Sequence, residues 1–175
     1  MYTIETPRLG LRPWKQSDLR VFTRMGLDPR VMEYFPGLLT PQQSLDMIGR
    51  IREFMEANHY GLWAVEIKKT GAFIGYTGFS VPRFKADFTP CVEIGWRLAF
   101  PYWSRGYATE AAAGCMEYGF TALGFEEIVS FTAAINKRSV RVMERIGMQY
   151  CQDFEHPALE DGSPLKTHVL YKKRK

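Results

Sequence analysis

The residues from Val92 to Leu98 alternate between apolar and polar side chains, which predicts a strand with two different faces. The apolar face consists of Val92, Ile94, Trp96 and Leu98. The other face consists of the charged residues Glu93 and Arg97 and of Gly95, which has no side chain. Pro101 prevents this strand from continuing. After a short turn, apolar residues recur at helical spacing from Ala112 to Leu123, and Gly124 follows as a C-terminal cap. We therefore predict a strand, a turn and a long helix, and expect the rest of the chain to be organised around them.

The same alternation, or a short apolar run between turn residues, predicts six further strands. They are expected at Ile4–Arg12, Leu62–Ile67, Ala72–Val81, Ile128–Thr132, Met148–Glu155 and Thr167–Tyr171. A helix separates Val92–Leu98 from Ile128–Thr132, so this pair of strands should be parallel and joined by a right-handed crossover. We also predict a bulge at Gly95, because a glycine inside a strand has no side chain to pack.

Further helices are predicted where apolar residues lie three and four positions apart and where capping residues precede them. They are expected from Ser17, at Pro29–Tyr34, from the Thr40 cap to about Ala57, and from the Asn136 cap to Gly147. The cap at Thr40 is the most specific of these signals, because Gln43 stands three residues later and completes a capping box.

The composition is that of an ordinary water-soluble enzyme, with 46% hydrophobic, 24% charged and 14% aromatic residues. The 175 residues are expected to form one domain, 1–175, because no repeat or linker divides them. No basic and apolar leader opens the chain and no apolar run reaches about 18 residues, so we expect a cytoplasmic protein without a membrane partner. The three cysteines lack metal-binding spacing, and neither a disulfide framework nor a metal site is expected.

The net charge of +4 would vanish without the four basic residues Lys172, Lys173, Arg174 and Lys175. The basicity therefore belongs to the C-terminal end, which we expect to be a solvated, frayed tail. A nucleic-acid partner is not expected, because no basic face with interleaved aromatic residues accompanies this run.

The turn before the long helix is a candidate anion site. A turn between a strand and a helix leaves main-chain N–H groups without partners, and the helix dipole favours negative charge there. Gly106 and Ala108 keep side chains away from the main chain, and Arg105 adds a positive charge. The turn therefore suits a diphosphate. Glycine retained only for packing would give the same pattern, and the residues alone leave both interpretations open.

Three segments resemble motifs of the GNAT superfamily of N-acetyltransferases. Trp103–Ala111 is similar to the loop that binds the pyrophosphate of acetyl-coenzyme A in that family; Gly106 and Ala108 match, whereas Trp103 departs from the pattern. Thr6–Pro13 and Asn136–Met148 fit the branch that contains the ribosomal-protein N-terminal alanine acetyltransferases. Together the three matches cover nearly the whole chain.

The resemblance implies an α/β (α+β) GNAT fold. Its central sheet is expected to be mixed and mostly antiparallel, with about seven strands, about four flanking helices and a splay at the parallel pair 91–100 and 128–132. The resemblance also implies acetyl-coenzyme A as the cosubstrate, without a metal. The residues implied to contact it are Ser104, Arg105, Gly106, Tyr107, Ala108 and Thr109 in the turn, the main chain of Leu98 and Ala99, and Asn136 and Ser139.

Acetyl transfer to an amine requires removal of the amine proton and delivery of a proton to the leaving thiolate. Glu93 is the only carboxylate on the strand beside the splay, so it is either the catalytic base or a surface carboxylate paired with a neighbouring cation. Glu66 is the reserve base. Many family members carry a tyrosine acid where this chain has Met143, and Ser139 matches a serine that serves instead in the ribosomal branch. Ser139 is equally consistent with a role in helix capping.

By resemblance, the acceptor pocket is lined by the first helices and the final strand, which makes Met32, Tyr34, Phe35 and His168 candidates for substrate binding, and Glu93 is a further candidate. Ordinary core packing explains Met32, Tyr34 and Phe35 at least as well. The acceptor is expected to be a primary amine, either a protein N-terminus or a small molecule, and the protein a monomer or homodimer. The missing tyrosine leaves one alternative, a catalytically weak or inactive module that binds coenzyme A. Cys115 lies on an apolar helix face and is expected to be an inert thiol rather than a nucleophile.

Overall fold

The computed structural model describes residues 1–175 as eight strands and four α-helices. The strands are β1 (Ile4–Glu5), β2 (Leu9–Arg12), β3 (Leu62–Ile67), β4 (Ala72–Ser80), β5 (Glu93–Leu98), β6 (Glu127–Ala133), β7 (Gln149–Glu155) and β8 (Thr167–Arg174). The α-helices are α1 (Leu19–Leu27), α2 (Pro41–Asn58), α3 (Tyr107–Thr121) and α4 (Lys137–Arg145), with short 3-10 turns η1 (Gln16–Asp18) and η2 (Phe100–Tyr102). No helix combines the length and the apolar composition that a membrane crossing requires.

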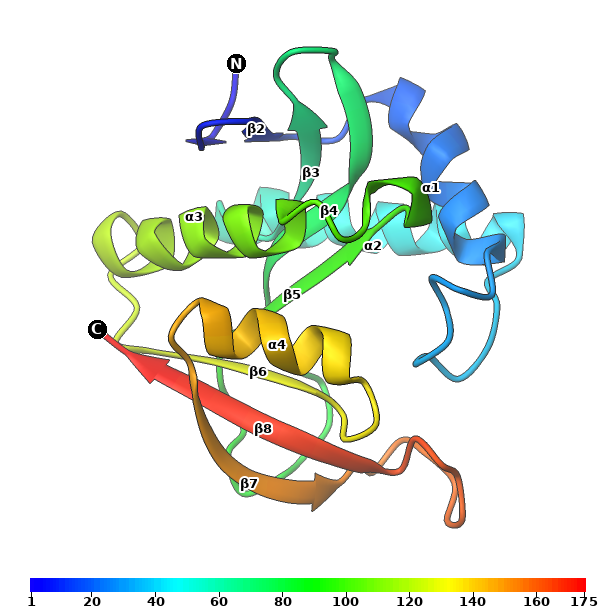
Figure 1. Ribbon diagram of the computed structural model, residues 1–175, viewed down its shortest axis with the longest axis vertical. Coiled ribbons are helices and arrows are strands. Elements are labelled where there is room, and N and C mark those ends of the chain that lie inside the picture. Colours follow the sequence, from blue (N-terminus) through cyan, green and yellow to red (C-terminus); the bar gives the residue numbers. More distant parts are fainter.

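All strands belong to one sheet with the order β1-β2-β3-β4-β5-β6-β8-β7. Every neighbouring pair is antiparallel except β5 and β6, which are parallel and share a single register pair, Glu93 opposite Val129. Beyond that pair the two strands separate (Figure 1). This confirms the predicted mixed α/β sheet with a splay between the parallel strands.

Helices cover both faces of the sheet. In Figure 1, α3 and α4 lie in front of the strands and α2 lies behind them. The larger apolar cluster joins α3 and α4 to residues such as Ile94, Leu98 and Ile128, whereas the smaller one joins α1 and α2 to Tyr76 and Ala99. Because successive residues of a strand point to opposite faces, Ile94 and Leu98 of β5 face α3, and Glu93, Gly95 and Arg97 face the side of α1 and α2.

The predicted helix caps at Thr40 and Asn136 are confirmed. The Thr40 hydroxyl accepts a hydrogen bond from the Gln43 N–H at 3.1 Å, and the Gln43 side chain accepts one from the Thr40 N–H at 2.8 Å. Asn136 Oδ1 accepts from the Ser139 N–H at 3.2 Å, which fixes the start of α4. These side chains satisfy N–H groups that a helix end leaves without partners.

The N-terminal segment differs from the prediction of a single strand over Ile4–Arg12. The Thr6 N–H bonds to the Leu9 carbonyl at 3.0 Å, so the chain turns around Pro7 and forms the hairpin β1–β2. Proline suits such a turn, since its φ is fixed and it lacks an N–H. The sheet consequently has eight strands rather than about seven.

The first two helical predictions also require correction. The helix predicted from Ser17 starts as the 3-10 turn η1, and α1 begins only at Leu19; Ser17 caps neither, and the Asp18 side chain closes the capping box of η1 by accepting from the Lys15 N–H at 2.7 Å. Pro29–Tyr34 forms turns with isolated hydrogen bonds instead of a short helix. A six-residue segment offers too few hydrogen bonds to offset the cost of helix nucleation.

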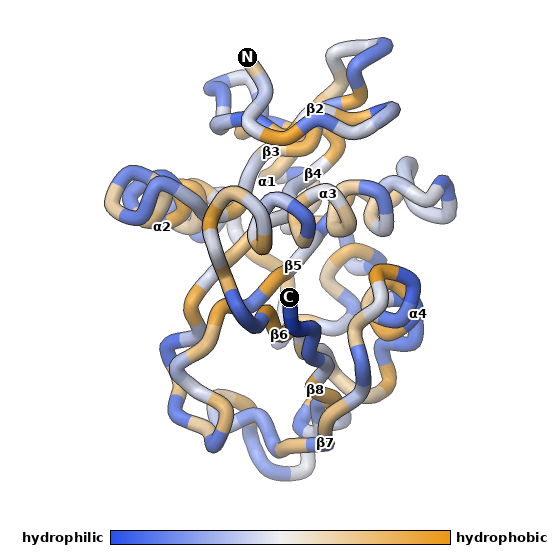
Figure 2. Tube along the Cα trace, turned by 90° about the vertical axis from the view of Figure 1, so that its left-hand side faces the viewer, coloured by the Kyte–Doolittle hydropathy of each residue, from blue (hydrophilic) through white to orange (hydrophobic).

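Gly95 and the C-terminal end also differ from expectation. The β4–β5 register runs without a shift through Gly95, and the irregularity in this part of the sheet lies at Val65 and Glu66 instead. Lys172 and Arg174 are not in a frayed tail, because they continue β8 and form ion pairs with Glu127 at 3.4 and 2.9 Å. Figure 2 shows this hydrophilic end of the chain beside β6.

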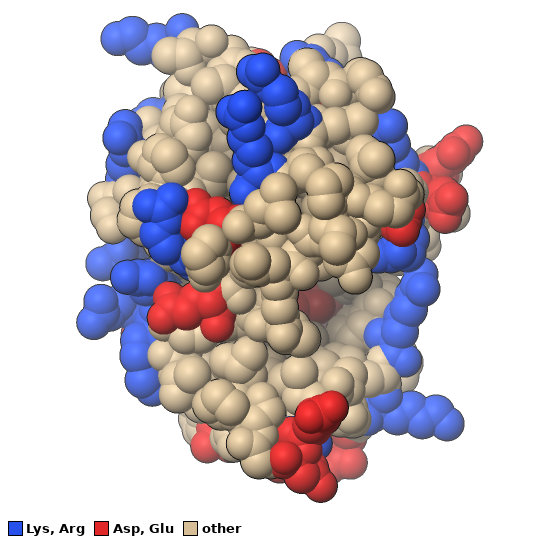
Figure 3. Space-filling view, turned by 90° about the vertical axis from the view of Figure 1, so that its right-hand side faces the viewer, with Lys and Arg blue, Asp and Glu red and all other residues tan.

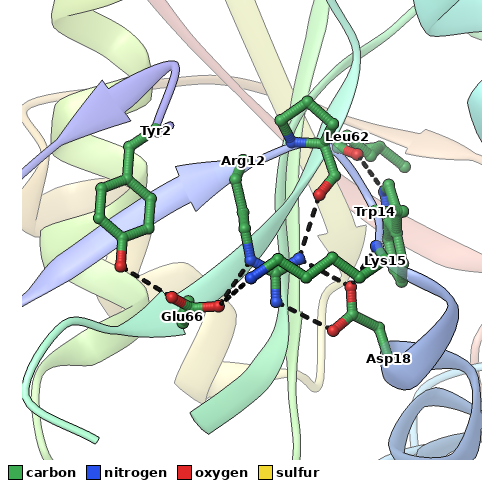
Figure 4. Close-up of polar contacts among 8 residues, drawn as sticks. Tyr2, Arg12, Trp14, Lys15, Asp18, Leu62 and Glu66 are labelled. Carbon is green, nitrogen blue, oxygen red and sulfur yellow. Dashed lines mark hydrogen bonds and ion pairs between the residues drawn. The ribbon is translucent and has the colours of Figure 1, made fainter. Parts of the chain in front are cut away.

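A buried polar network holds the N-terminal strands to the sheet (Figure 4). The Arg12 guanidinium donates to Asp18 at 2.8 and 2.9 Å and to Glu66 at 2.6 Å. Glu66 also accepts from the Tyr2 hydroxyl at 2.7 Å and from Lys15 Nζ at 3.1 Å. Burial alone would raise the pKa of Glu66, but these donors outweigh it and lower the pKa to about 2. The network therefore consists of charges that satisfy one another.

Candidate active site

The turn between η2 and α3 presents a row of unbonded main-chain donors. Ser104 and Gly106 both adopt positive φ angles, 59° and 78°, and Gly106 is the residue before the helix. None of the N–H groups from Ser104 to Thr109 donates a hydrogen bond within the protein. The chain thus turns these donors outward at the positive end of a 15-residue helix.

The segment around Arg8 holds this turn in place. Arg8 donates to the Arg105 carbonyl at 3.0 Å, pairs with Glu110 in the first turn of α3, and lies over the Tyr107 ring at 4.6 Å. Glu110 also accepts from the Thr6 hydroxyl at 2.7 Å, and these donors lower its pKa against the opposing effect of burial. Arg8 was not predicted as a site residue, although it lies within the Thr6–Pro13 motif.

The geometry of the turn fits a diphosphate. The Arg105 side chain is exposed and forms no ion pair, so it remains available as a cation. A side chain built on Gly106 would meet only Arg8, at 3.3 Å, on the surface where the donors point. Unbonded N–H groups, a helix N-terminus and an unpaired cation together form an anion-binding cradle.

The edge of β5 that faces β6 carries main-chain groups beyond the last shared pair. Val92 and Ile94 use their carbonyls there, accepting from the Val129 N–H and the Ser130 hydroxyl, both at 2.9 Å. Further along, the Leu98 carbonyl accepts from the Trp103 indole at 2.7 Å. Since alternate residues of a strand present their main chain to the same edge, Trp96 turns its main chain toward the gap between these positions, where it has no partner in β6.

This arrangement refines the expected main-chain contacts. Ala99 uses its N–H on the Ile74 carbonyl at 2.8 Å and its carbonyl on the Tyr102 N–H at 3.0 Å, so neither group is free. The Leu98 carbonyl is also occupied. Trp96, which the sequence analysis missed, and the Leu98 N–H are therefore the groups that an extended ligand arm would meet in the gap. No sequence signal distinguishes these residues from their neighbours, because the pairing of β5 with β4 decides which residues of β5 turn their main chain toward the gap.

Asn136 and Ser139 lie at the start of α4, beside the end of β6. Asn136 is fixed at both ends of its amide, since Nδ2 donates to Thr132 Oγ1 at 2.9 Å while Oδ1 caps the helix. Only the main chain of Ser139 takes part in this cap; its hydroxyl makes no hydrogen bond and is partly exposed. Met143 is completely buried in the core cluster, so no side chain at that position reaches a ligand.

Glu93 carries an unpaired carboxylate at the point where β5 and β6 separate. Its only side-chain partner is the Ser80 hydroxyl, which donates at 3.1 Å, and no lysine or arginine forms an ion pair with it. The surface ion pair considered for Glu93 is therefore absent. Burial raises the pKa of Glu93 to about 7, and the hydrogen bond from Ser80 opposes this rise only in part. A carboxyl group with such a pKa exchanges protons readily near neutral pH.

Glu66, the reserve base, is excluded by its environment. It lies in the Arg12 network, where its carboxylate receives hydrogen bonds from three side chains. A carboxylate with a pKa of about 2 and a completed set of donors is a poor proton acceptor.

Segment 28–40, between α1 and α2, contacts both β5 and α4. Figure 3, which views the molecule from the right-hand side of Figure 1, shows a hollow with acidic atoms at its back. Phe35, which is 36% exposed, covers the Arg97 guanidinium at 3.9 Å. Glu33 forms an ion pair with Arg138 of α4 at 3.6 Å, which links the segment to the start of that helix. Tyr34, beside Glu33, has a raised pKa because it is desolvated.

His168 lies in a cluster of aromatic rings formed by β6, β7, β8 and the loop before β5. Its ring is 4.8 Å from that of His156 and 5.6 Å from that of Phe154. It is 9% exposed, and burial lowers its pKa. The imidazole is therefore mainly neutral near pH 7, and its contact with an acceptor stays a prediction.

The structure agrees with the exclusion of a cysteine nucleophile. Cys115 is completely buried on α3, and burial strongly raises the pKa of its thiol. A thiol that stays protonated and has no access to solvent does not act as a nucleophile. The other two cysteines, Cys91 and Cys151, are also unbridged.

Comparison with known proteins agrees with this geometry. A family model described as an acetyltransferase (GNAT) domain matches residues 8–149. The uncharacterized protein YkkB of Bacillus subtilis (strain 168) is 35% identical over 146 residues, which cover 83% of this chain and 84% of that protein. The solved acetyltransferase from Agrobacterium tumefaciens str. C58 has a TM-score of 0.80 at 26% identity and covers 100% of this chain and 95% of its own.

A structure with a bound coenzyme has the same fold. Mycobacterium smegmatis RimJ in complex with CoA-disulfide has a TM-score of 0.76 at 20% identity, with 95% of this chain and 81% of that chain covered. At this identity the likeness concerns the fold alone.

Proposed function

The chain belongs to the GNAT acetyltransferase family and is an acetyl-coenzyme A-dependent N-acetyltransferase, and from this premise we propose direct transfer of the acetyl group to a primary amine in a ternary complex. The observation that carries the proposal is the unpaired Glu93 carboxylate where β5 and β6 separate, together with a turn beyond the other end of β5 that offers six unbonded N–H groups. The first supplies a proton acceptor and the second holds a diphosphate.

Each part of the site has one task in this proposal. The Ser104–Thr109 turn and Arg105 hold the pyrophosphate, while Trp96 and the Leu98 N–H orient the pantetheine arm, whose thioester supplies the acetyl group. Glu93 accepts a proton from the amine, directly or through water, so that the nitrogen can bond to the acetyl carbon as the carbon–sulfur bond breaks. The Ser139 hydroxyl, free of other hydrogen bonds, donates a proton toward the departing sulfur.

The acceptor is an amine of either of two kinds, a small molecule or a protein N-terminus. Solved structures of the same fold carry names of both kinds, a ribosomal-protein-S5-alanine acetyltransferase from Vibrio fischeri and a spermidine N-acetyltransferase from Vibrio cholerae.

The test is an acceptor screen with purified protein, acetyl-coenzyme A and a set of small amines and peptides with free N-termini. Release of free thiol that requires an added amine, with formation of the matching N-acetyl product, is the expected result. Binding of acetyl-coenzyme A without turnover toward any amine would instead favour the alternative of an inactive coenzyme-binding module, for which Met143 in place of an acidic tyrosine is the supporting feature.

A further inference from the structure

Two arginines of the sheet are buried, and only one of them has partners. Arg12 is 4% exposed and donates to two carboxylates and a carbonyl. Arg97 is 8% exposed, and its Nε and Nη1 are buried without a hydrogen bond or an ion pair. A buried cation that lacks partners opposes folding unless something compensates for its lost hydration. The position of Arg97 therefore needs an explanation outside the chain's own hydrogen bonds.

Aromatic contacts do not provide that explanation. The Arg97 guanidinium lies 3.9 Å from the centre of the Phe35 ring and 5.5 Å from that of Tyr76. Rings stacked on a guanidinium attract its charge. Its N–H groups, however, lie in the plane of the group and point out of its edge. The rings thus hold the guanidinium in one orientation and leave its donors unsatisfied.

The same sheet face carries Glu93 at a fixed distance from Arg97. Across β4 and β5, three register pairs follow one another: Tyr76 with Arg97, Gly78 with Gly95, and Ser80 with Glu93. The middle pair has no side chains, and a side chain built on Gly95 would meet no atom within 4 Å. A stretch of sheet without side chains therefore separates the Arg97 cation from the Glu93 carboxylate. The Cα atoms of these two residues lie about 13 Å apart, at roughly 3.3 Å per residue.

We propose that Arg97 binds the carboxylate of the acceptor, so that the acceptor is a small aliphatic amine with one carboxylate whose amino end reaches Glu93. This assignment of the substrate class rests on the proposed function. A carboxylate matches the in-plane donors of a guanidinium with two parallel hydrogen bonds. One cation between two aromatic rings compensates a single negative charge, which favours a carboxylate over a doubly charged phosphate.

The test compares acids with their amides as acceptors. The acids are glycine, β-alanine, 4-aminobutyrate and 6-aminohexanoate, and each is paired with its carboxamide, which keeps the amine and removes the charge. We expect the protein to prefer at least one acid over its amide by more than tenfold in kcat/KM. Arg97→Met should abolish that preference, because it lowers kcat/KM for the acid far more than for its amide. Arg97→Lys, which keeps the charge without the planar fork, should lose part of the preference.

Two controls separate this role from a structural one. Arg30→Met removes an arginine that also stacks on a ring, Phe100 at 3.9 Å, but is exposed and paired with Asp28; it should leave the preference intact. The unfolding temperature of Arg97→Met should not fall, because the variant loses an unpaired charge. Equal rates for acid and amide in the parent protein, or an equal loss of both in Arg97→Met, would overturn the proposal.

A binding measurement keeps the two proposals distinguishable. If no amine is acetylated, titration of the coenzyme A complex with 6-aminohexanoate by calorimetry decides the role of Arg97 alone. Binding in the parent and its loss in Arg97→Met would support the carboxylate site although the proposed function had failed. Absence of binding for every acid in the series would overturn the carboxylate site.

Discussion

Two glutamates on the strands either side of β4 show how the surroundings of a residue decide its chemistry. Glu66 and Glu93 both belong to the polar positions of the central sheet, but Glu66 receives three donors and Glu93 receives one. Their pKa values consequently move in opposite directions, to about 2 and about 7. Only Glu93 is left with a proton affinity that suits transfer near neutral pH.

The first prediction concerns the pH dependence of Glu93. Its pKa of about 7 means that the carboxylate forms, and can accept a proton, only as the pH rises through 7. The parent kcat/KM should therefore rise with a midpoint near pH 7. Glu93→Gln should lack this rise, be slower by about a hundredfold above pH 7, and approach the parent as the pH nears the pKa of the amine itself.

Ser80→Ala provides the control for this assignment. The Ser80 hydroxyl lowers the pKa of Glu93, so its removal should shift the midpoint of the rise to higher pH without abolishing it. Rate profiles of Glu93→Gln and the parent that overlay from pH 6 to 9 would show that Glu93 is not the base.

The second prediction separates the two roles of Ser139. The helix cap uses only the Ser139 N–H, which an alanine also has, so Ser139→Ala should keep the start of α4 and the unfolding temperature. If the hydroxyl donates a proton to the sulfur, kcat should fall by roughly tenfold to a hundredfold with little change in coenzyme affinity. Ser139→Thr, which keeps a hydroxyl, should retain most of the rate. An alanine variant with the parent kcat would leave only the capping role.

At the scale of elements, α3 combines a binding end and a structural end. Its first residue follows Gly106 at a φ of 78°, and its last turn leads to Gly124 at a φ of 71°. Only the first of these glycines lies beside unbonded N–H groups. A side chain at either position would therefore strain the backbone in the same way, but only at Gly106 would its charge lie beside unbonded N–H groups. The two glycines thus provide a matched pair of variants.

The third prediction uses this pair. Gly106→Glu should weaken acetyl-coenzyme A binding by more than tenfold, because a side chain and a negative charge then stand where the pyrophosphate binds. Gly124→Glu has open space around it and should bind the coenzyme as the parent does, despite a comparable loss of stability. Isothermal calorimetry on both folded variants checks this; equal affinities for the two would contradict the location of the site.

Viewed as a whole, the fold followed from local patterns more fully than the site did. Alternation over Val92–Leu98 predicted β5, and the Thr40 and Asn136 caps placed two helices, since each signal lies within a few residues. The hairpin at Pro7 was missed, and the last strand was predicted to end at Tyr171 although it continues to Arg174, because both features depend on partners elsewhere in the sheet. For the same reason the sequence could not separate Glu66 from Glu93: their donors come from Tyr2, Arg12, Lys15 and Ser80.

Arg97 illustrates the limit of local reasoning most clearly. The alternation along β5 places Arg97 on the polar face of the strand, where an arginine is expected to be solvated. Its burial results from Phe35, which arrives from a segment about 60 residues earlier in the chain and whose fold as turns was itself mispredicted.

The last prediction concerns the stability of the whole molecule in acid. The pKa of Glu66 is near 4.5 when unperturbed and about 2 in the fold, so its contribution is present above pH 4.5 and is lost as the pH falls from 4.5 toward 2. This difference corresponds to about 3 kcal/mol of unfolding free energy. Denaturant unfolding from pH 7 to pH 2 should therefore show a steep loss below pH 4.5.

Glu66→Gln should be less stable than the parent at pH 7, because Arg12 then lacks one charged partner, and its stability should fall less steeply below pH 4.5. Glu5→Gln is the control: Glu5 pairs only loosely with Lys68, at 3.6 Å, and its side chain is 62% exposed, so its loss should leave the acid profile unchanged. Parallel pH profiles for Glu66→Gln and the parent would mean that the Arg12 network is not what ties the N-terminal hairpin to the sheet in acid.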